Sequence, residues 1–242
     1  MKESMITSDR CCLPLRALTI ALVAAAALGV GAHDARAQTA HPLQDRFLLG
    51  VGTHQGLGGA VGKRGYVPAI NIRQMQELGV TSFRDDLSWS DFELPDRRLG
   101  FAAPLSRLEA QINARVARPI LILGAGHHLV PNSLPPTTDE ARQRFVDYAI
   151  AAARSVSGLP PLFELWNEWN IAIRKNPAFN AENYLALAAV TYPAVKRIAP
   201  NAPFIVGAIG DDPGWRWTES LLQGGLLKYA DGIVLAQGDM AV

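Results

Sequence analysis

The sequence predicts an α/β fold in which parallel strands alternate with helices, and three observations lead to it. Short apolar runs of strand length recur six times between Phe47 and Ala236. Segments with helical spacing of apolar residues separate these runs. Polar and aromatic residues follow the first four strands at the point where each strand stops. Strands joined by helices pair in parallel through right-handed crossovers, so these polar ends should meet at one edge of the sheet.

The first 37 residues predict a secretory signal peptide. Arg10 and Arg16 precede an apolar run at residues 17–30, and a small-residue A-x-A cleavage motif ends at Ala37. The run is shorter than the ~20 residues of a membrane-spanning helix, which favours export over a membrane anchor. We therefore expect a secreted or periplasmic protein whose mature domain is residues 38–242.

The composition describes one ordinary globular domain. The chain is 49% hydrophobic and carries a formal net charge of +1, so nucleic acid is not an expected partner. Both cysteines, Cys11 and Cys12, lie inside the predicted signal peptide. A mature chain without cysteine forms no disulfide and no thiolate metal site, and we expect neither a metal nor a cofactor.

The first predicted strand, residues 47–52, leads into a glycine-rich loop at residues 56–65. A phosphate-binding P-loop would need glycine in place of Leu57 and serine or threonine in place of Arg64. A dinucleotide-binding loop would need its third glycine where Val61 stands. The loop therefore does not predict a nucleotide site.

Residues 70–78 have helical spacing, and the second predicted strand, residues 80–84, follows them. Charged residues come next at its carboxyl end. Arg84 has two interpretations at this stage: a residue of a functional site, or half of a structural ion pair with the adjacent Asp85 or Asp86.

A second helix is predicted at residues 105–114, before a third buried strand at residues 118–124. His127 and His128 follow this strand. Adjacent side chains on an extended chain point to opposite sides, so the two histidines do not suit a single metal ion. Contact of one of them with a ligand is favoured by its position, and a packing role is the alternative.

The remaining elements continue the alternation. A long helix opens at Thr138 with acidic residues in its first turn, which complements the helix dipole. The predicted elements from there on are a helix at 138–152, a strand at 159–166, a helix at 181–198, a strand at 203–208, a helix at 217–222 and a strand at 232–236.

The fourth strand runs directly into polar groups beside two indoles. Asn167 and Glu168 come at its carboxyl end, between Trp166 and Trp169. A carboxyl pressed against indole rings is partly desolvated, which raises its pKa towards the range where it donates a proton near neutral pH. The alternative is a buried aromatic strand that ends in a surface glutamate.

Trp166-Asn167-Glu168, followed by Trp169-Asn170, resembles the strand-four signature of clan A retaining glycoside hydrolases, and most of all family 39 and its exopolysaccharide-degrading relatives. The resemblance covers about residues 47–236. It implies a TIM-type (β/α)8 barrel that hydrolyses O-glycosidic bonds in a β-linked polysaccharide or oligosaccharide. Glu168 would be the general acid/base, and Asn167 would bind the sugar 2-hydroxyl.

The resemblance extends to residues on other strands. It implies that Arg84 supports the catalytic nucleophile and that Trp89 walls the cleft. We also expect Trp166 to contact the substrate, together with His127 or His128, which follow the third strand.

The barrel is expected to be incomplete, because about six of eight β/α units are present. In the clan, the nucleophilic glutamate ends strand seven, which would lie beyond Val242. The chain alone is then expected to be inactive. The alternative function is a non-catalytic carbohydrate-binding or envelope protein, which a second carboxylate close to Glu168 would argue against.

Overall fold

The computed structural model describes residues 49–53, 67–94, 96, 98–100, 108, 118–124, 135–156, 161–174 and 176–235. All of them belong to one compact unit, Arg46–Val242. Its six strands form a single sheet in chain order, and every neighbouring pair is parallel. The strands are β1 (Gly50–Gly52), β2 (Ser82–Ser88), β3 (Arg118–Gly124), β4 (Leu162–Leu165), β5 (Phe204–Ile209) and β6 (Gly232–Leu235).

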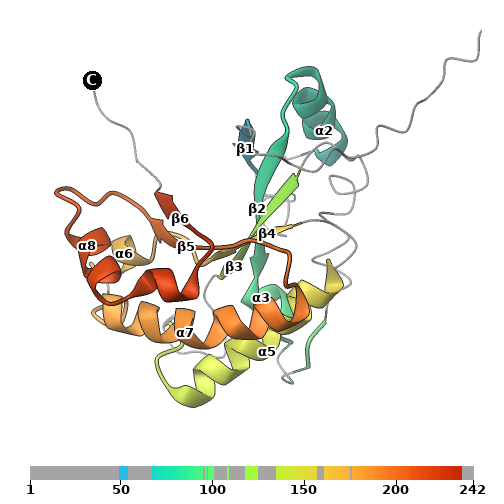
Figure 1. The fold of residues 1–242 in the computed structure, drawn as a ribbon. Coiled ribbons are helices and arrows are strands. Elements are labelled where there is room, and N and C mark those ends of the chain that lie inside the picture. Colours follow the sequence, from blue (N-terminus) through green and yellow to red (C-terminus); the bar gives the residue numbers. More distant parts are fainter. Residues whose placement is uncertain are drawn as a thin grey trace, which may run out of the picture. The chain divides into compact units, whose positions relative to one another are not determined.

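The helices connect successive strands, so the unit is a half-barrel of the TIM type (Figure 1). The long helices α5 and α7 lie side by side against the sheet. The described helical segments are α2 (Pro68–Glu77), α3 (Trp89–Phe92), α5 (Asp139–Ser155), α6 (Trp169–Ala172), α7 (Ala181–Ile198), α8 (Arg216–Gln223) and the 3₁₀ turn η2 (Leu226–Tyr229).

Side-chain caps define where the two long helices begin. The hydroxyl of Thr138 accepts from the N–H of Ala141 at 3.2 Å, and the amide oxygen of Asn180 accepts from the N–H of Asn183 at 2.9 Å. Each cap satisfies one of the first N–H groups, which have no partner inside the helix.

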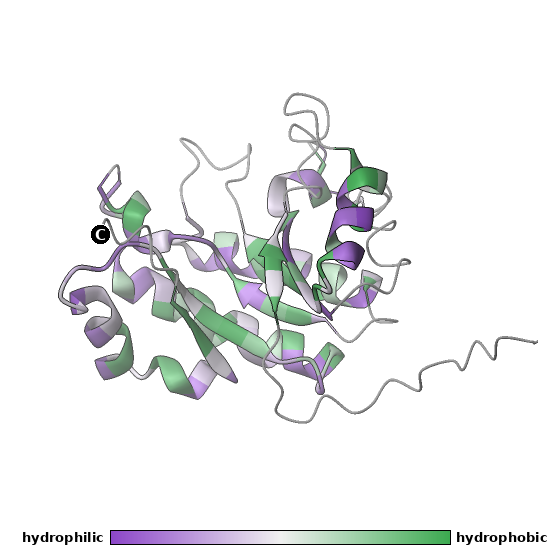
Figure 2. Cartoon of the chain, turned by 90° about the horizontal axis from the view of Figure 1, so that it is seen from above, coloured by the Kyte–Doolittle hydropathy of each residue, from purple (hydrophilic) through white to green (hydrophobic). Residues whose placement is uncertain are grey.

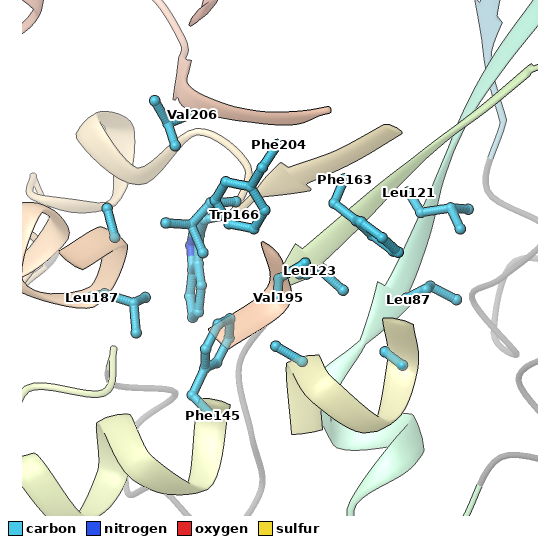
Figure 3. Close-up of a cluster of buried hydrophobic side chains, with 14 of the residues drawn as sticks. Leu87, Leu121, Leu123, Phe145, Phe163, Trp166, Leu187, Val195, Phe204 and Val206 are labelled. Carbon is cyan, nitrogen blue, oxygen red and sulfur yellow. The ribbon is translucent and has the colours of Figure 1, made fainter. Parts of the chain in front are cut away.

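The hydrophobic core lies between the sheet and these helices. Alternate residues of β3, β4 and β5 face it, which is the period-two pattern of a pleated strand. In β4, Phe163 and Leu165 are fully buried in this cluster. Figure 3 shows Phe163 and Phe204 near the strand layer, with Phe145 reaching up from α5. Hydrophobic residues are concentrated in the strands, whereas the helices carry both hydrophobic and hydrophilic residues (Figure 2).

Two buried tyrosines tie the helices to the carboxyl ends of the strands. Tyr148 of α5 donates to the carbonyl of Leu87 at the end of β2. Tyr184 of α7 donates to the carbonyl of Leu165 at 2.9 Å and accepts from the N–H of Gly207 at 2.7 Å. Burial raises the pKa of both phenols, so they remain neutral donors. These hydrogen bonds therefore fix β2, β4 and β5 relative to the helices α5 and α7.

The second strand is longer than the sequence predicts. Its pairing with β3 continues from Ser82 to Ser88, so Asp85 and Asp86 lie within the strand rather than after it. The carboxylates are tolerated there because one is hydrogen-bonded: Asp85 accepts from the hydroxyl of Thr53 at 2.5 Å. The short segments α3, α6 and η2 were not predicted, and the helix predicted at 105–114 falls almost entirely outside the described residues.

Candidate active site

The chain turns sharply where β4 ends, and its backbone is strained there. Trp166 has φ of 66° and Glu168 has φ of 48°, both in the left-handed region that residues with a Cβ rarely adopt. Such conformations cost about 1–3 kcal/mol each and cluster at functional sites. Asn167 and Glu168 are exposed on this turn, whereas Trp166 and Trp169 are buried beneath it.

The two indoles support the turn from the core side. Their rings meet edge to face at 5.0 Å, and Trp169 makes the same kind of contact with Tyr184 at 5.2 Å. The indole N–H of Trp169 donates to the carbonyl of Asn180 at 3.1 Å, which anchors the turn to the start of α7. The sequence-based expectation that these indoles desolvate Glu168 is wrong, because they face the core and the glutamate is exposed. Trp166 is only 5% exposed, so the expectation that it meets the substrate is wrong in this structure as well.

A hydrogen-bonded network lies on the other face of the strands, beside Asn167. Arg84 donates through Nε to Glu164 Oε2 at 2.6 Å and through Nη2 to Glu164 Oε1 at 2.7 Å. The same Nη2 donates to Asn167 Oδ1 at 2.8 Å. The paired carboxylate is thus neither Asp85 nor Asp86, and it lies 80 residues further along the chain.

The electrostatics of this pair follow from burial. Burial raises the pKa of Glu164 above its ordinary value, although the bonds from Arg84 act in the opposite direction. For Arg84, burial alone would lower the pKa, but the carboxylate of Glu164 raises it overall. The arginine therefore stays charged, and the strand carries a buried, satisfied ion pair next to Asn167.

Trp89 does not line a cleft. Its side chain is fully buried, and its ring packs edge to face on Phe145 at 5.3 Å and stacks on Tyr148 at 6.2 Å. The expectation that Trp89 walls the cleft is therefore wrong, because the strand continues to Ser88 and the turn that follows directs the indole into the core. His127 and His128 lie outside the described residues.

The loop after β5 is fastened to the turn that carries Glu168. Asn170 accepts from the N–H of Gly210 at 2.9 Å and donates to the carbonyl of Asp211 at 3.1 Å. A Cβ on Gly210 would lie 2.4 Å from Ile171 Cδ1 and 2.8 Å from Ile171 Cγ1, so any other residue would require the Ile171 side chain to move. The loop after β5 is therefore held next to the turn after β4 by two hydrogen bonds.

The acidic residues after β5 have other contacts. Asp212 caps α8 by accepting from the N–H groups of Trp217 and Thr218 at 3.1 and 2.9 Å. Asp211 lies 3.9 Å from Arg174. Trp215 follows in the same loop, 52% exposed and with φ of 58°. An exposed indole on a strained backbone at this edge is a candidate ligand contact that the sequence did not single out.

Comparison with known proteins identifies the fold. No protein-family model matches the sequence, and no curated protein does. Solved structures do match: a family 39 glycoside hydrolase from Bacteroides cellulosilyticus WH2 at 25% identity and TM-score 0.62, over 76% of this chain. A family 39 enzyme from Xanthomonas axonopodis pv. citri matches at 21% and 0.59, over 77%, and a family 39 β-xylosidase from Caulobacter crescentus at 18% and 0.59, over 79%. The chain has the fold of family 39 glycoside hydrolases.

The chain spans 37%, 40% and 46% of the length of these three glycoside hydrolases. In barrels of this type the active site is built at the carboxyl ends of the strands. Asn167, Glu168 and the loop after β5 lie at that end. Asp231, by contrast, accepts from the N–H of Phe204 at 2.8 Å, which places it at the opposite end, as its position before β6 predicts.

Within the described part of the chain, no cluster of three or more histidine, cysteine or acidic side chains has the arrangement of a metal site. Among the same residues, no helix is long and apolar enough to cross a bilayer. Of the functional candidates, the sequence missed Glu164, Asn170 and Trp215. For Glu164 a signal was available, because a carboxylate in the middle of a buried strand requires a partner.

Proposed function

We propose that this chain carries the acid/base side of a retaining glycosidase site that acts on a β-linked polysaccharide or oligosaccharide. The observation that supports it most is the placement of Glu168 at the carboxyl end of β4, adjacent to an Asn167 that is held by the buried pair of Arg84 and Glu164. Family 39 neighbours with the same fold are glycosidases, which supports this reaction class.

In this proposal Glu168 donates a proton to the glycosidic oxygen as the bond to the sugar breaks. It then accepts a proton from the water that releases the sugar. The exposed position of Glu168 allows both steps, because the leaving group and the water must each reach the same carboxyl. Asn167 contributes a hydrogen bond to the bound sugar.

A retaining mechanism also needs a carboxylate nucleophile about 5–5.5 Å from the acid/base. Two carboxylates of the described region do not suit that role. Glu164 is buried against Arg84, and Asp212 accepts three hydrogen bonds at the start of α8. We assign the nucleophile to no described residue, and we propose that the chain does not complete turnover with the described residues alone.

The test compares wild type with Glu168→Gln on purified β-glycans and on aryl β-glycosides whose leaving groups need little protonation. In any assembly that turns over, Glu168→Gln should reduce glycan hydrolysis by about 10²–10⁴-fold and spare much of the aryl-glycoside cleavage step. Glu182→Gln, an exposed acid on α7, is the matched control.

Full activity of Glu168→Gln on natural glycan would overturn the assignment. Glycan binding by the wild-type chain, without turnover under any condition, would instead favour a non-catalytic carbohydrate-binding protein. That second candidate function would use the same residues around Asn167. It is supported by the fact that Glu164 is paired with Arg84 and Asp212 is hydrogen-bonded to Thr218, so neither suits the role of nucleophile.

A further inference from the structure

We infer that Arg84 is a positioning residue that orients the Asn167 carboxamide, so that its Nδ2 is the group turned towards a ligand, as a hydrogen-bond donor. The ligand in this inference rests on the proposed function, but the orientation of the Asn167 amide does not. The inferred role of Arg84 differs from the expected one beside a nucleophile, because here the guanidinium acts on the sugar-binding amide.

The chemistry of the guanidinium group decides the orientation. All its N–H groups are donors and it has no acceptor. The atom of Asn167 that lies 2.8 Å from Arg84 Nη2 must therefore be the carbonyl oxygen, Oδ1. The amide nitrogen, Nδ2, then faces away from Arg84. Within the described part of the chain, no group accepts a hydrogen bond from it.

Arg84 itself has little freedom to turn. Its Nε and Nη2 are both bonded to the two oxygens of Glu164, a two-point contact that fixes the plane of the guanidinium. The side chain of Glu164 is 0% exposed, and that of Arg84 is 30% exposed. Glu164 lies on β4 and Arg84 on β2. The strand between them, β3, pairs with both, so the arginine side chain reaches across β3 to the glutamate.

The orientation of the amide restricts which ligand atoms Nδ2 of Asn167 can bind. An amide held with its oxygen on Arg84 can bind a hydroxyl, ether or carbonyl oxygen through Nδ2, because these atoms accept hydrogen bonds. A protonated amine has no lone pair with which to accept a hydrogen bond from Nδ2. The site should therefore prefer neutral sugars over amino sugars that carry a free ammonium at the position facing Asn167.

The first experiment requires no ligand. In Asn167→Asp, the introduced carboxyl should face Arg84, and its pKa, followed by the ¹³Cγ chemical shift against pH, should fall about one pH unit or more below the usual value of about 3.9. The same substitution in an Arg84→Met/Glu164→Gln background should return to the ordinary value. That background removes both charges together, so no buried carboxylate is left unpaired. An ordinary pKa in Asn167→Asp alone would overturn the inference.

The second experiment measures binding of cellotriose and of the matching β-1,4 trimer of glucosamine, at a pH where the amines are protonated. We expect wild type to bind cellotriose more tightly, and Asn167→Asp, which keeps the Arg84 contact but loses the donor, to lose about tenfold or more in affinity. Arg98→Met, which removes an exposed arginine that pairs with Asp96, is the control and should match wild type.

Equal or tighter binding of the glucosamine trimer would contradict the inference. Failure of every β-glycan to bind would count against the proposed function, and the titration of Asn167→Asp would still decide the orientation of the amide.

Discussion

Replacing Arg84 with methionine should destabilise the protein strongly, and the effect should depend on pH. The substitution removes the cation that pairs with the Glu164 carboxylate, whose side chain is 0% exposed. Removing one partner of a buried pair costs about 3–5 kcal/mol. Because Arg84 is 30% exposed and water can partly replace it, we expect the lower end, about 3 kcal/mol at neutral pH. That is a large share of the roughly 5–15 kcal/mol that stabilises a typical domain.

The sign of the pH dependence follows from Glu164. Its folded-state pKa is already raised by burial, and loss of Arg84 raises it further. Below about pH 4.3, the usual pKa of glutamate, the group is protonated in both the folded and unfolded states and imposes no penalty. As the pH rises from there through the folded pKa, the folded state resists ionisation and stability falls. The deficit of Arg84→Met should therefore be small near pH 4 and full near pH 7.

Urea unfolding of Arg84→Met and wild type at about pH 4 and about pH 7 measures this difference. Arg98→Met removes an arginine from an exposed pair with Asp96 and should change stability by less than about 1 kcal/mol at either pH. Arg84→Met/Glu164→Gln should recover much of the loss at neutral pH. A deficit that is the same at both pH values, or no larger than that of Arg98→Met, would refute the reasoning.

Three further predictions concern the supports of the site. Tyr184→Phe removes the partner of the buried Gly207 N–H and should cost about 1–3 kcal/mol in urea unfolding, with faster hydrogen exchange at that amide; unchanged exchange would contradict it. Gly124→Ala places a Cβ 3.0 Å from the Cα of Trp166, so it should cost about 1–3 kcal/mol and weaken glycan binding, whereas a stable variant with unaltered binding would show that the turn relaxes freely. Asp231 has a lowered pKa, because its hydrogen bonds and the nearby lysine outweigh the effect of burial. Its contribution to the free energy of unfolding is therefore present above about pH 3.9 and is lost on acidification. Asp231→Asn should flatten the acid limb of the stability profile without changing glycan binding.

Much of the fold is determined locally, and the sequence predicts it for that reason. The third strand is observed at Arg118–Gly124 and α7 at Ala181–Ile198, both with the predicted bounds. An apolar run bounded by turn residues, and a helical period opened by a capping residue, are short-range signals. The same reasoning placed Asn167 and Glu168 at the carboxyl end of β4, because a parallel α/β sheet gathers its strand ends at one edge.

Tertiary structure alone decided what surrounds those residues. The sequence left Arg84 with a choice of neighbours, but its partner is Glu164, 80 residues away and two strands across the sheet. Trp89 and Trp166 were expected at the ligand and are buried in the core instead. A one-residue shift in the pairing register of a strand moves each side chain to the opposite face, and short-range patterns alone do not determine the long-range contacts that result. Short-range periodicity therefore determines the type and order of the elements, whereas the contacts of the site depend on long-range pairing between strands.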